Sequence, residues 1–303
     1  MKDKANKRLN KALDQIFKGV SLNTKRAMVA KWRAWSKHNK GIDGKETIGD
    51  ARSFIASLKK KGVAQSTIHH YSIVLKSIYE KLIDYQILED NIFEKVAKQT
   101  KKGSVGLRRP TKLTPFEKVM EMLEACKELK HTEVKQAILA ILYGAGRRLG
   151  ELEKIELNDL HKTDAGHLYI TLRETKNGQD FNAVIPDDLA EYVYTLAECR
   201  RKEGESHLFK ESYKTLYRYF KDVATACGLD VSPHSGRATA ITYLLDKGMD
   251  YQQVKEFSGH ASINTVSLYD KRRYQKDNSP ALAIFYDDIK GDVKKNILKG
   301  DSF

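Results

Sequence analysis

Residues 146–152 read Gly-Arg-Arg-Leu-Gly-Glu-Leu, residues 233–237 read Pro-His-Ser-Gly-Arg, and Gly259-His260 is followed nine residues later by Tyr269. Their polar side chains suit phosphate chemistry. A guanidinium binds two phosphate oxygens at once, a tyrosine oxygen can act as a nucleophile, and histidine or lysine can move a proton. We therefore expect the second half of the chain to fold so that these stretches meet around one phosphate.

Arg148 is the arginine of residues 146–152 that we assign to the phosphate. Its guanidinium can stabilise the charge that builds in a pentacoordinate transition state. Glu151 lies three residues on, on the same helical face, and can orient Arg148. Glu151 and Leu152 are in register with Arg148, which favours Arg148 over Arg147. Taken alone, the motif is equally compatible with a surface arginine beside a helical neighbour.

His234 and Arg237 are three residues apart at the start of a predicted helix, so their side chains share one face. This spacing predicts a second phosphate clamp at Arg237 and a proton-handling group at His234. Lys176 follows the first strand of a predicted hairpin, where its ammonium can protonate a leaving 5′-oxygen. An exposed turn lysine is the structural alternative.

Tyr269 is one of 15 tyrosines, with Tyr274 and Tyr286 as nearby rivals. Its spacing from His260, which can hydrogen-bond the phosphate, favours Tyr269. A tyrosine oxygen is a weak nucleophile at its normal pKa and needs neighbouring cations and in-line placement.

The excess positive charge lies in the first third of the chain. The net charge is +14, and residues 1–110 hold 25 lysines and arginines against 10 acidic residues. This distribution indicates a domain that neutralises nucleic-acid phosphates, with a solvated lysine-rich surface as the alternative. The residues predicted to contact DNA are Lys25, Arg26, Lys31, Arg33, Lys101, Lys102, Arg108 and Arg109.

The periodicity predicts a helical domain over residues 1–100, a basic linker over 101–112 and a second domain over 113–303. In the first domain we expect helices along 9–17, 23–38, 48–58, 66–82 and 87–96, the fourth capped by Ser66. Trp32 and Trp35 lie among basic residues, and at least one of them is expected to fill the core rather than contact DNA.

In the second domain, Thr114-Pro115-Phe116-Glu117 predicts a capped helix start, with further helices to about residue 155. Strands are predicted at 168–173 and 181–185, with a turn at Asn177-Gly178. The later predicted helices span 187–201, 213–227, 234–246 (ended by Gly248), 251–257 and 262–269. The predicted class is mostly α with a small β-sheet.

Several other classes of protein are excluded by composition. The longest apolar run, residues 137–143, is too short to span a bilayer, and no apolar segment follows the basic start. The three cysteines are widely spaced, which predicts no metal site and fits a reducing cytoplasm. No phosphate-binding glycine loop is present either, and we expect a cytoplasmic protein.

Taken together, the ordered set of Arg148, Lys176, His234-x-x-Arg237, His260 and Tyr269 resembles the tyrosine recombinase (phage integrase) family. The resemblance runs over most of residues 111–275, and the helical first domain is similar to that family's core-binding domain. The layout is closest to Cre-like and Xer-like members. Two positions depart from the pattern: Gly236 stands where leucine is common, and Arg147 where an apolar residue is usual.

The resemblance implies a C-shaped clamp on duplex DNA, with a mixed α/β catalytic domain. It implies transesterification through a 3′-phosphotyrosyl link and a Holliday junction, by a homotetramer on two DNA sites with inverted repeats. The resemblance also implies that no ATP, metal or other cofactor is needed and that the protein is nucleoid-associated. A helix at about 279–290 carries an apolar stripe, which either docks on the next subunit or packs on its own domain. Two alternatives stay open: a type IB-like topoisomerase, and a non-catalytic DNA-binding protein on the same fold.

Overall fold

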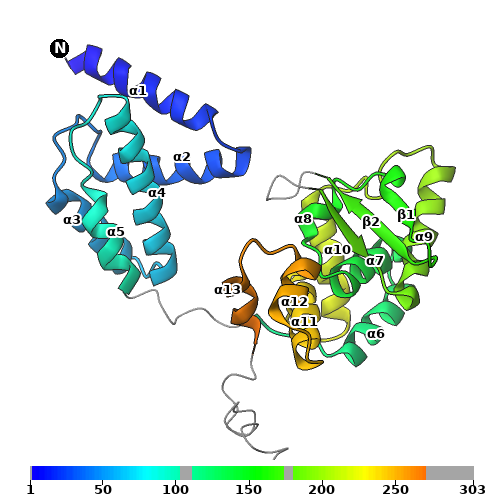
Figure 1. The fold of residues 1–303 in the computed structure, drawn as a ribbon. Helices are drawn as coiled ribbons and strands as arrows, with labels where there is room; N and C mark the ends of the chain where they lie inside the picture. Colours follow the sequence, from blue (N-terminus) through cyan, green and yellow to red (C-terminus); the bar gives the residue numbers. More distant parts are fainter. Residues whose placement is uncertain (1, 103–110, 174–179, 271–303) are drawn as a thin grey trace, which may run out of the picture. The chain divides into compact units, whose positions relative to one another are not determined.

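The computed structural model describes residues 2–102, 111–173 and 180–270, and the chain divides into two units, Met1–Pro110 and Thr111–Phe303 (Figure 1). Each unit has a hydrophobic core of its own. Several predicted features lie outside the described residues: Arg108, Arg109, the Asn177-Gly178 turn, Lys176 and the helix expected at 279–290.

The first unit is all-helical. Its helices bury one face each and expose a charged face, as an amphipathic helix does. Thr47 and Asp50 form a reciprocal capping box that fixes the start of α3. The helices are α1 (Lys2–Lys18), α2 (Leu22–His38), α3 (Ile48–Lys60), α4 (Gln65–Asp84) and α5 (Phe93–Lys102).

Both tryptophans of α2 belong to the core of the first unit. Trp32 is 8% exposed and Trp35 is 0% exposed. The Trp35 indole Nε1 donates a 3.1 Å hydrogen bond to the Tyr79 hydroxyl on α4, and the Trp35 ring packs edge-on against Phe54 and Phe93. The prediction that at least one tryptophan fills the core is therefore confirmed for both Trp32 and Trp35, and neither ring is exposed for contact with DNA.

Three details of the first unit differ from the sequence prediction. Helix α4 begins at Gln65, after Ala64, so the prediction that Ser66 caps it is wrong. The helix expected at 87–96 begins only at Phe93, because the Asn91 carboxamide oxygen accepts from the Phe93 amide while its amide nitrogen donates to the Lys76 carbonyl. Helix α5 then extends to Lys102, into the stretch expected to be a linker.

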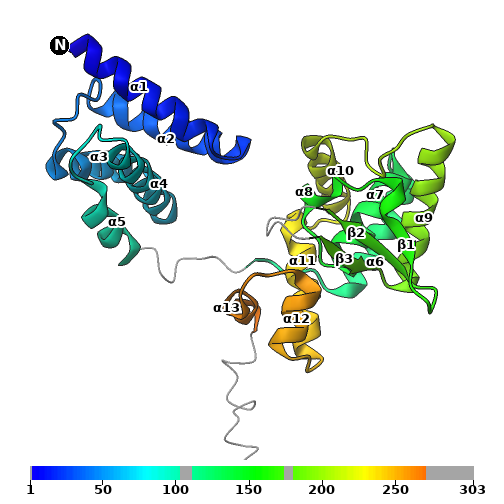
Figure 2. The same cartoon turned by 45° about the horizontal axis from the view of Figure 1, so that its top comes forward.

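The second unit combines helices with a small sheet (Figure 2). Both views place the sheet on one side of this unit and α11 with α12 on another. The α-helices are α6 (Phe116–Ala125), α7 (Thr132–Leu139), α8 (Leu149–Leu152), α9 (Asp187–Lys202), α10 (Tyr213–Ala226), α11 (Pro233–Asp246), α12 (Tyr251–Ser258) and α13 (Ile263–Val266). Short 3-10 turns occupy Cys126–Glu128, Leu157–Asp159 and Ser267–Tyr269.

The sheet is antiparallel, in the order β1 (Leu160–Lys162), β2 (Leu168–Leu172), β3 (Phe181–Val184). Ile170 at the centre of β2 pairs with a residue on each neighbouring strand. Strands β2 and β3 were predicted, whereas β1 was missed. Its three residues offer too short a pattern, and all three are at least partly exposed.

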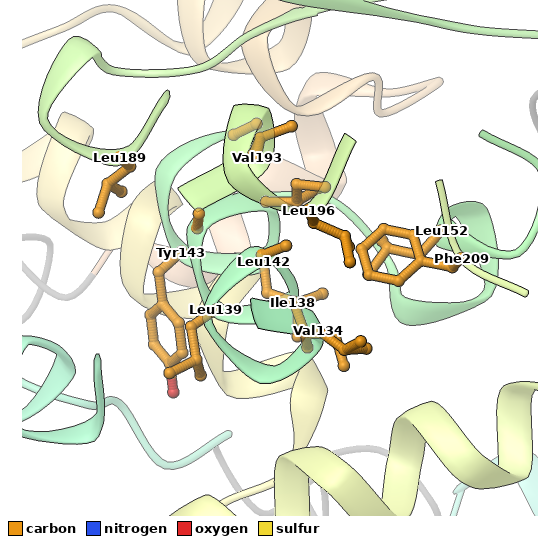
Figure 3. Packing of buried hydrophobic residues seen from close by; sticks show 14 of the residues in the cluster. Val134, Ile138, Leu139, Leu142, Tyr143, Leu152, Leu189, Val193, Leu196 and Phe209 are labelled. Atoms are coloured by element: carbon orange, nitrogen blue, oxygen red, sulfur yellow. The ribbon is translucent and has the colours of Figure 1, made fainter. Parts of the chain in front are cut away.

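The core of the second unit is built around α7 and the π-helical turn Ala140–Gly144 that continues it (Figure 3). Ile138, Leu139 and Leu142 are 0% exposed there. Leu189, Val193 and Leu196 of α9 pack against them. The turn ends directly before residues 145–148, so the best-packed element of the unit leads into the arginine motif.

The predicted start of α6 is wrong in its cap. Pro115, not Thr114, is the cap residue, and the side chain of Thr114 is used elsewhere. The Thr114 hydroxyl and the buried Tyr143 hydroxyl share a 2.9 Å hydrogen bond, and the Thr114 amide donates to the Thr239 hydroxyl. Tertiary contacts therefore outweigh the local capping bond. By contrast, Gly248 follows the end of α11 with a φ of +88°, as predicted.

The prediction of a mostly helical chain with a small sheet is confirmed. Across the described ranges, we find no helix whose length and hydrophobicity suit it to crossing a bilayer.

We expect Gly236→Ala to lower the melting temperature of the protein. A Cβ at Gly236 would lie 3.0 Å from the backbone carbon, the backbone oxygen and the Cβ of Leu142, where the packed π-helical turn leaves little room to move. Overpacking of this kind costs about 1–3 kcal/mol, which outweighs the gain of about 1 kcal/mol that alanine brings to a helix. Gly150→Ala is the matched control, since its Cβ would meet only the Tyr213 ring at 3.8 Å. Equal melting temperatures for the two variants would contradict this packing argument.

Candidate active site

Four parts of the second unit carry the polar residues. Arg148 is the cap residue of α8, and His234 and Arg237 lie in the first turns of α11. His260 follows Gly259, which ends α12 in a left-handed conformation with a φ of +63°. Tyr269 ends the 3-10 turn after α13. Each of these side chains thus lies at or near the end of a helix or a 3-10 turn.

Arg148 and Glu151 form the contact that their spacing predicted. Arg148 Nη1 lies 2.8 Å from Glu151 Oε1, and the Arg148 backbone amide donates to Glu151 Oε2 at 3.0 Å. The Arg148 side chain remains 35% exposed, whereas Glu151 is 14% exposed. One carboxylate therefore fixes both the backbone and the guanidinium of Arg148 and leaves part of that guanidinium accessible.

Arg237 is wholly buried. Its Nη1 donates to the Gly146 carbonyl oxygen at 3.0 Å, and its Nη2 donates to His260 Nε2 at 3.1 Å. Burial, reinforced by the nearby Arg148 cation, lowers the pKa of Arg237 to about 10, so it stays charged at neutral pH. Its Nε has no hydrogen-bond partner within the part of the chain that the structure describes, and an unsatisfied buried donor is typical of a functional site.

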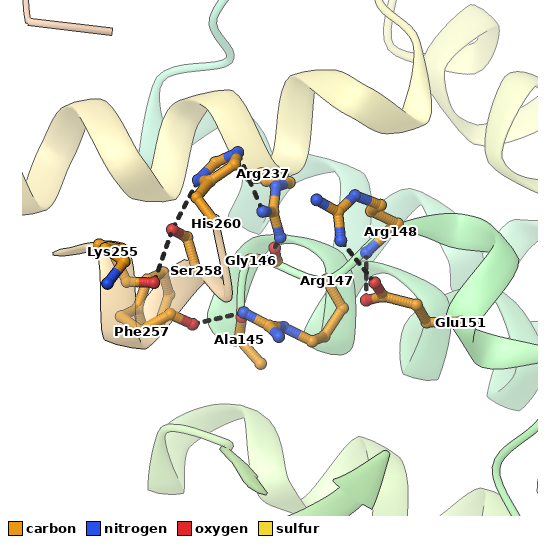
Figure 4. Close-up of polar contacts among 10 residues, drawn as sticks. All are labelled: Ala145, Gly146, Arg147, Arg148, Glu151, Arg237, Lys255, Phe257, Ser258 and His260. Atoms are coloured by element: carbon orange, nitrogen blue, oxygen red, sulfur yellow. Dashed lines mark hydrogen bonds and ion pairs between the residues drawn. The ribbon is translucent and has the colours of Figure 1, made fainter. Parts of the chain in front are cut away.

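His260 is neutral and its tautomer follows from its partners (Figure 4). An arginine can only donate, so His260 Nε2 accepts from Arg237 and the ring proton resides on Nδ1. That Nδ1 donates to the Ser258 hydroxyl at 2.7 Å, which in turn donates to the Lys255 carbonyl. Burial, followed by the charge of Arg237, lowers the pKa of His260 to about 4.

Tyr269 lies beside His234. The Tyr269 hydroxyl is 3.2 Å from His234 Nε2, and the Tyr269 and His260 ring centroids are 6.0 Å apart. Burial raises the pKa of Tyr269, although Arg237 and Arg148 oppose the shift. Burial also lowers the pKa of His234, again helped by the two arginines. The tyrosine is thus protonated in the free protein, and a neutral imidazole stands ready to accept its proton.

The structure brings together six of the seven predicted catalytic and supporting residues: Arg148, Glu151, His234, Arg237, His260 and Tyr269. Lys176 lies outside the described residues. Two further residues were not foreseen. Ser258 fixes the His260 tautomer, and Arg147 contacts the Phe257 carbonyl at the end of α12. Nothing in the spacing of Ser258 distinguishes it from any other serine, whereas Arg147 was visible as an unusual charge beside Arg148.

The predicted DNA-contact residues with described side chains lie in the first unit. Lys25, Arg26 and Arg33 are exposed on α2, and Arg26 and Arg33 are two helical turns apart on one face. Lys31 is half-buried over the Tyr71 ring, 5.3 Å from its centroid, and burial lowers its pKa. Lys31 is therefore less available to a phosphate than the other three cations. Lys101 and Lys102 form the last turn of α5.

No group of three or more histidine, cysteine, aspartate or glutamate side chains suited to a metal ion occurs in residues 2–102, 111–173 and 180–270. The site is instead rich in cations. Burial lowers the pKa of Arg147, and the charges of Arg237 and Arg148 lie close enough to lower it further. Such a cluster, with Glu151 as its ion-paired carboxylate, suits an anion.

Comparison with protein families identifies this arrangement. Residues 112–276, which contain every residue of the site, match the model of the phage integrase family. The chain belongs to the phage integrase family. The resemblance inferred from the sequence is confirmed, and so is the prediction of an enzyme of the tyrosine site-specific recombinase class.

Relatives and solved structures agree with membership of the phage integrase family. Tyrosine recombinase XerA of Pyrococcus furiosus is 28% identical over 235 residues, which cover 74% of this chain and 76% of the relative. Tyrosine recombinase XerD of Listeria monocytogenes is 25% identical over 278 residues, covering 84% and 89%. A lambda integrase tetramer bound to a Holliday junction has a similar fold, with a TM-score of 0.67 and 17% identity over 89% of this chain and 78% of that one.

The depressed pKa of His260 has a consequence for stability in this phage integrase family member. In the unfolded chain this histidine has its ordinary pKa of 6.5, whereas the pKa of folded His260 is about 4. As pH falls from about 6.5 towards 4, the unfolded state therefore gains protons first and the free energy of unfolding decreases.

We expect thermal melting curves at pH 7, 6 and 5 to show this loss in the parent protein and a smaller loss in His260→Gln. The two proteins share every other histidine, so the difference between their curves reports on His260. Parallel curves for the two proteins would show that folded His260 titrates normally.

Proposed function

We propose that this chain is a site-specific recombinase that cuts and rejoins duplex DNA by transesterification, with Tyr269 as the nucleophile. The observation that carries the proposal is the Tyr269 hydroxyl 3.2 Å from His234 Nε2, in the site that also holds Arg148, Arg237 and His260. The proposed nucleophile, base and cations all come from one chain. Each subunit therefore carries its own set of catalytic residues, apart from Lys176, which lies outside the described residues.

In the cleavage step, the Tyr269 oxygen attacks the scissile phosphorus while its proton passes to His234 Nε2. A bond forms between phosphorus and the tyrosine oxygen, and the bond from phosphorus to the 5′-oxygen breaks. The product is a 3′-phosphotyrosyl link and a free 5′-hydroxyl. A 5′-hydroxyl of another strand then attacks the same phosphorus and releases the tyrosine. Each step replaces one phosphoester bond with another, so the chemistry requires neither ATP nor a metal ion.

The two arginines serve the transition state. Arg148 and Arg237 hold the phosphate oxygens as negative charge builds on them, because guanidinium groups bind such oxygens in pairs. Glu151 keeps Arg148 in place, and its burial makes that contact strong. His260 acts through Arg237 in the free protein, since its Nε2 accepts from that guanidinium. When Arg237 rotates onto a phosphate, His260 Nε2 loses its hydrogen-bond donor. The proton on His260 Nδ1 then has to move to Nε2 before His260 can donate from Nε2 to a phosphate oxygen.

Lys176 protonates the leaving 5′-oxygen in this proposal. Its place in the sequence between β2 and β3, within the family match, supports the role. Arg237 and His260 are poor acids for this purpose, because Arg237 stays charged to about pH 10 and His260 is neutral above about pH 4.

DNA recognition and assembly complete the proposal. The basic residues 1–110 and the exposed cations of α2 support a first domain that binds the duplex, while the catalytic domain over residues 113–303 acts on the same DNA. Exposed Lys25, Arg26 and Arg33 are the DNA contacts that we assign to the first domain.

We further propose a homotetramer on two inverted-repeat sites, supported by the lambda integrase tetramer bound to a Holliday junction. The segment at about 279–290 would join neighbouring subunits.

Tyr269→Phe is expected to abolish covalent capture of DNA. The parent protein, Tyr269→Phe and a control variant, Tyr243→Phe, are each incubated with sheared genomic DNA from the source organism. The mixtures are then denatured, and the DNA fragments that stay linked to protein are sequenced. Tyr243 is 43% exposed on α11, where its ring lies against Phe116 and Lys247, so a phenylalanine that keeps the ring should behave as the parent. Adducts at one inverted-repeat sequence, absent only from Tyr269→Phe, support the recombinase.

Other outcomes separate the alternatives. Adducts scattered over many sequences, without strand exchange between two linear duplexes, would indicate a type IB-like topoisomerase. Adducts that persist in Tyr269→Phe would exclude this nucleophile. Sequence-specific DNA capture without any covalent adduct would indicate a non-catalytic DNA-binding protein.

Lys176→Ala is expected to slow adduct formation by about 10²- to 10⁴-fold, the usual contribution of general acid catalysis, with unchanged affinity in gel-shift titrations. A substrate whose leaving 5′-oxygen is replaced by sulfur tests the role directly, because a thiolate leaves without a proton. The variant should recover the parent's rate on that substrate. A persistent defect, or a large loss of affinity, would contradict a leaving-group role.

A further inference from the structure

Arg147 differs from its neighbour Arg148 in where its side chain lies. Arg147 is 1% exposed, and its guanidinium extends towards Ala145 and Phe257, whereas Arg148 extends towards Glu151 (Figure 4). A buried arginine is costly unless its donors are satisfied. The hydrogen bonds and ring contacts of Arg147 therefore indicate the role of its buried charge.

The guanidinium of Arg147 joins two backbone segments. Its Nε donates to the Ala145 carbonyl at 2.8 Å, and its Nη2 donates to the Phe257 carbonyl. Phe257 is the penultimate residue of α12, where carbonyl groups lack partners within the helix and carry the negative end of its dipole. A cation at this point therefore caps α12 with a charge-assisted hydrogen bond.

Two aromatic rings cover the same guanidinium. Its carbon lies 4.3 Å from the centroid of the Phe181 ring and 6.0 Å from that of Phe257. No carboxylate within the described ranges forms an ion pair with Arg147, and burial lowers its pKa to about 9. The cation is thus held by carbonyl oxygens and ring faces, a set that fixes direction more closely than a mobile carboxylate does.

The contacts of Arg147 close a circuit around the phosphate-binding residues. From Arg147 the path runs through the Phe257 carbonyl to Ser258, which follows it in α12. Ser258 accepts from His260, His260 accepts from Arg237, and Arg237 donates to the Gly146 carbonyl beside Arg147. Every link is a hydrogen bond or a peptide bond.

Packing leaves this circuit little freedom. Gly146 has a φ of +62°, and a Cβ there would lie 2.8 Å from a ring carbon of Phe257. A Cβ at Gly259 would lie 3.4 Å from the Phe181 ring and 3.8 Å from Arg147 Nη1. The turn before Arg148 therefore packs on Phe257 and the turn before His260 packs on Phe181, and both of these rings lie against the Arg147 guanidinium.

We propose that Arg147 is a positioning residue that ties the turn at Gly146 to the end of α12 and so fixes Arg237, His260 and Arg148 relative to one another. The inference rests on the proposed function for its effect on catalysis, but its effect on the free protein is independent of that function. Arg147 does not itself meet the phosphate, because its Nε and Nη2 are bound to carbonyl oxygens and its faces are covered.

Three variants test the role. Arg147→Met keeps an unbranched side chain of similar length without the charge or the donors. Arg147→Lys keeps the charge but concentrates its donors on one nitrogen, so it cannot reach the Ala145 and Phe257 carbonyls in the same geometry. Arg201→Met is the matched control, as Arg201 is an exposed arginine in the last turn of α9.

The first measurement is amide hydrogen exchange of the free protein at neutral pH. In the parent, the amides of Gly259 and His260 donate to the Glu256 and Lys255 carbonyls in the last turn of α12. We expect Arg147→Met to speed exchange at these two amides by about tenfold or more, as loss of a hydrogen bond to a charged group predicts, with the core amides of α7 unchanged. Unchanged exchange at Gly259 and His260 would overturn the proposal, as would an equal acceleration throughout the second unit.

The second measurement is the rate of covalent adduct formation on a nicked duplex carrying the site found by sequencing. We expect Arg147→Met to be slower by about 10- to 100-fold, the scale of a small misplacement of catalytic groups, with unchanged DNA affinity. Arg147→Lys should remain slow, whereas Arg201→Met matches the parent. Full recovery in Arg147→Lys would show that the charge alone is needed and would overturn positioning. A parent protein that forms no adduct counts against the proposed function, while the exchange result still decides the role of Arg147.

Discussion

The buried guanidinium of Arg237 is the contact on which the site depends. It lies in the first turns of α11, where its hydrogen bonds reach the Gly146 carbonyl before α8 and His260 after α12. Three stretches that are distant in the sequence are thereby joined at one side chain. Burial without a carboxylate partner is costly for a cation, and the α7 core and the Arg147 circuit supply the rigidity that keeps it in place.

The electrostatics of the site are set by the same burial. Burial, helped by the closely placed arginines, lowers the pKa of His234 and of His260 and keeps both neutral, and burial raises the pKa of Tyr269 and keeps it protonated. A phosphate entering this site would experience the charges of three arginines against that of the Glu151 carboxylate, and we propose that the tyrosine loses its proton only as it attacks. A tyrosine nucleophile that stays protonated until its substrate is bound protects DNA from unintended cleavage.

Much of this could be predicted from the sequence, because helix periodicity and the order of polar motifs are local signals. The long helices and strands β2 and β3 were predicted near their observed positions, and six site residues meet as expected. The caps at Ser66 and Thr114 failed because a local bond competes with tertiary partners, as Thr114 shows with Tyr143. Strand β1 was too short to have a pattern. The roles of Ser258 and Arg147 depend on which carbonyl or ring lies opposite them, and no spacing in the sequence encodes that.

The central claim is that Tyr269, and no other tyrosine, becomes linked to DNA within its own subunit's site. Its most direct test is to trap the adduct on DNA, digest both components and identify the nucleotide-bearing peptide by mass spectrometry. The account predicts a nucleotide on Tyr269, in the peptide that follows α13. A nucleotide on Tyr274 or Tyr286 instead would contradict it, because the hydroxyl beside His234 would then be a packing contact and not the nucleophile.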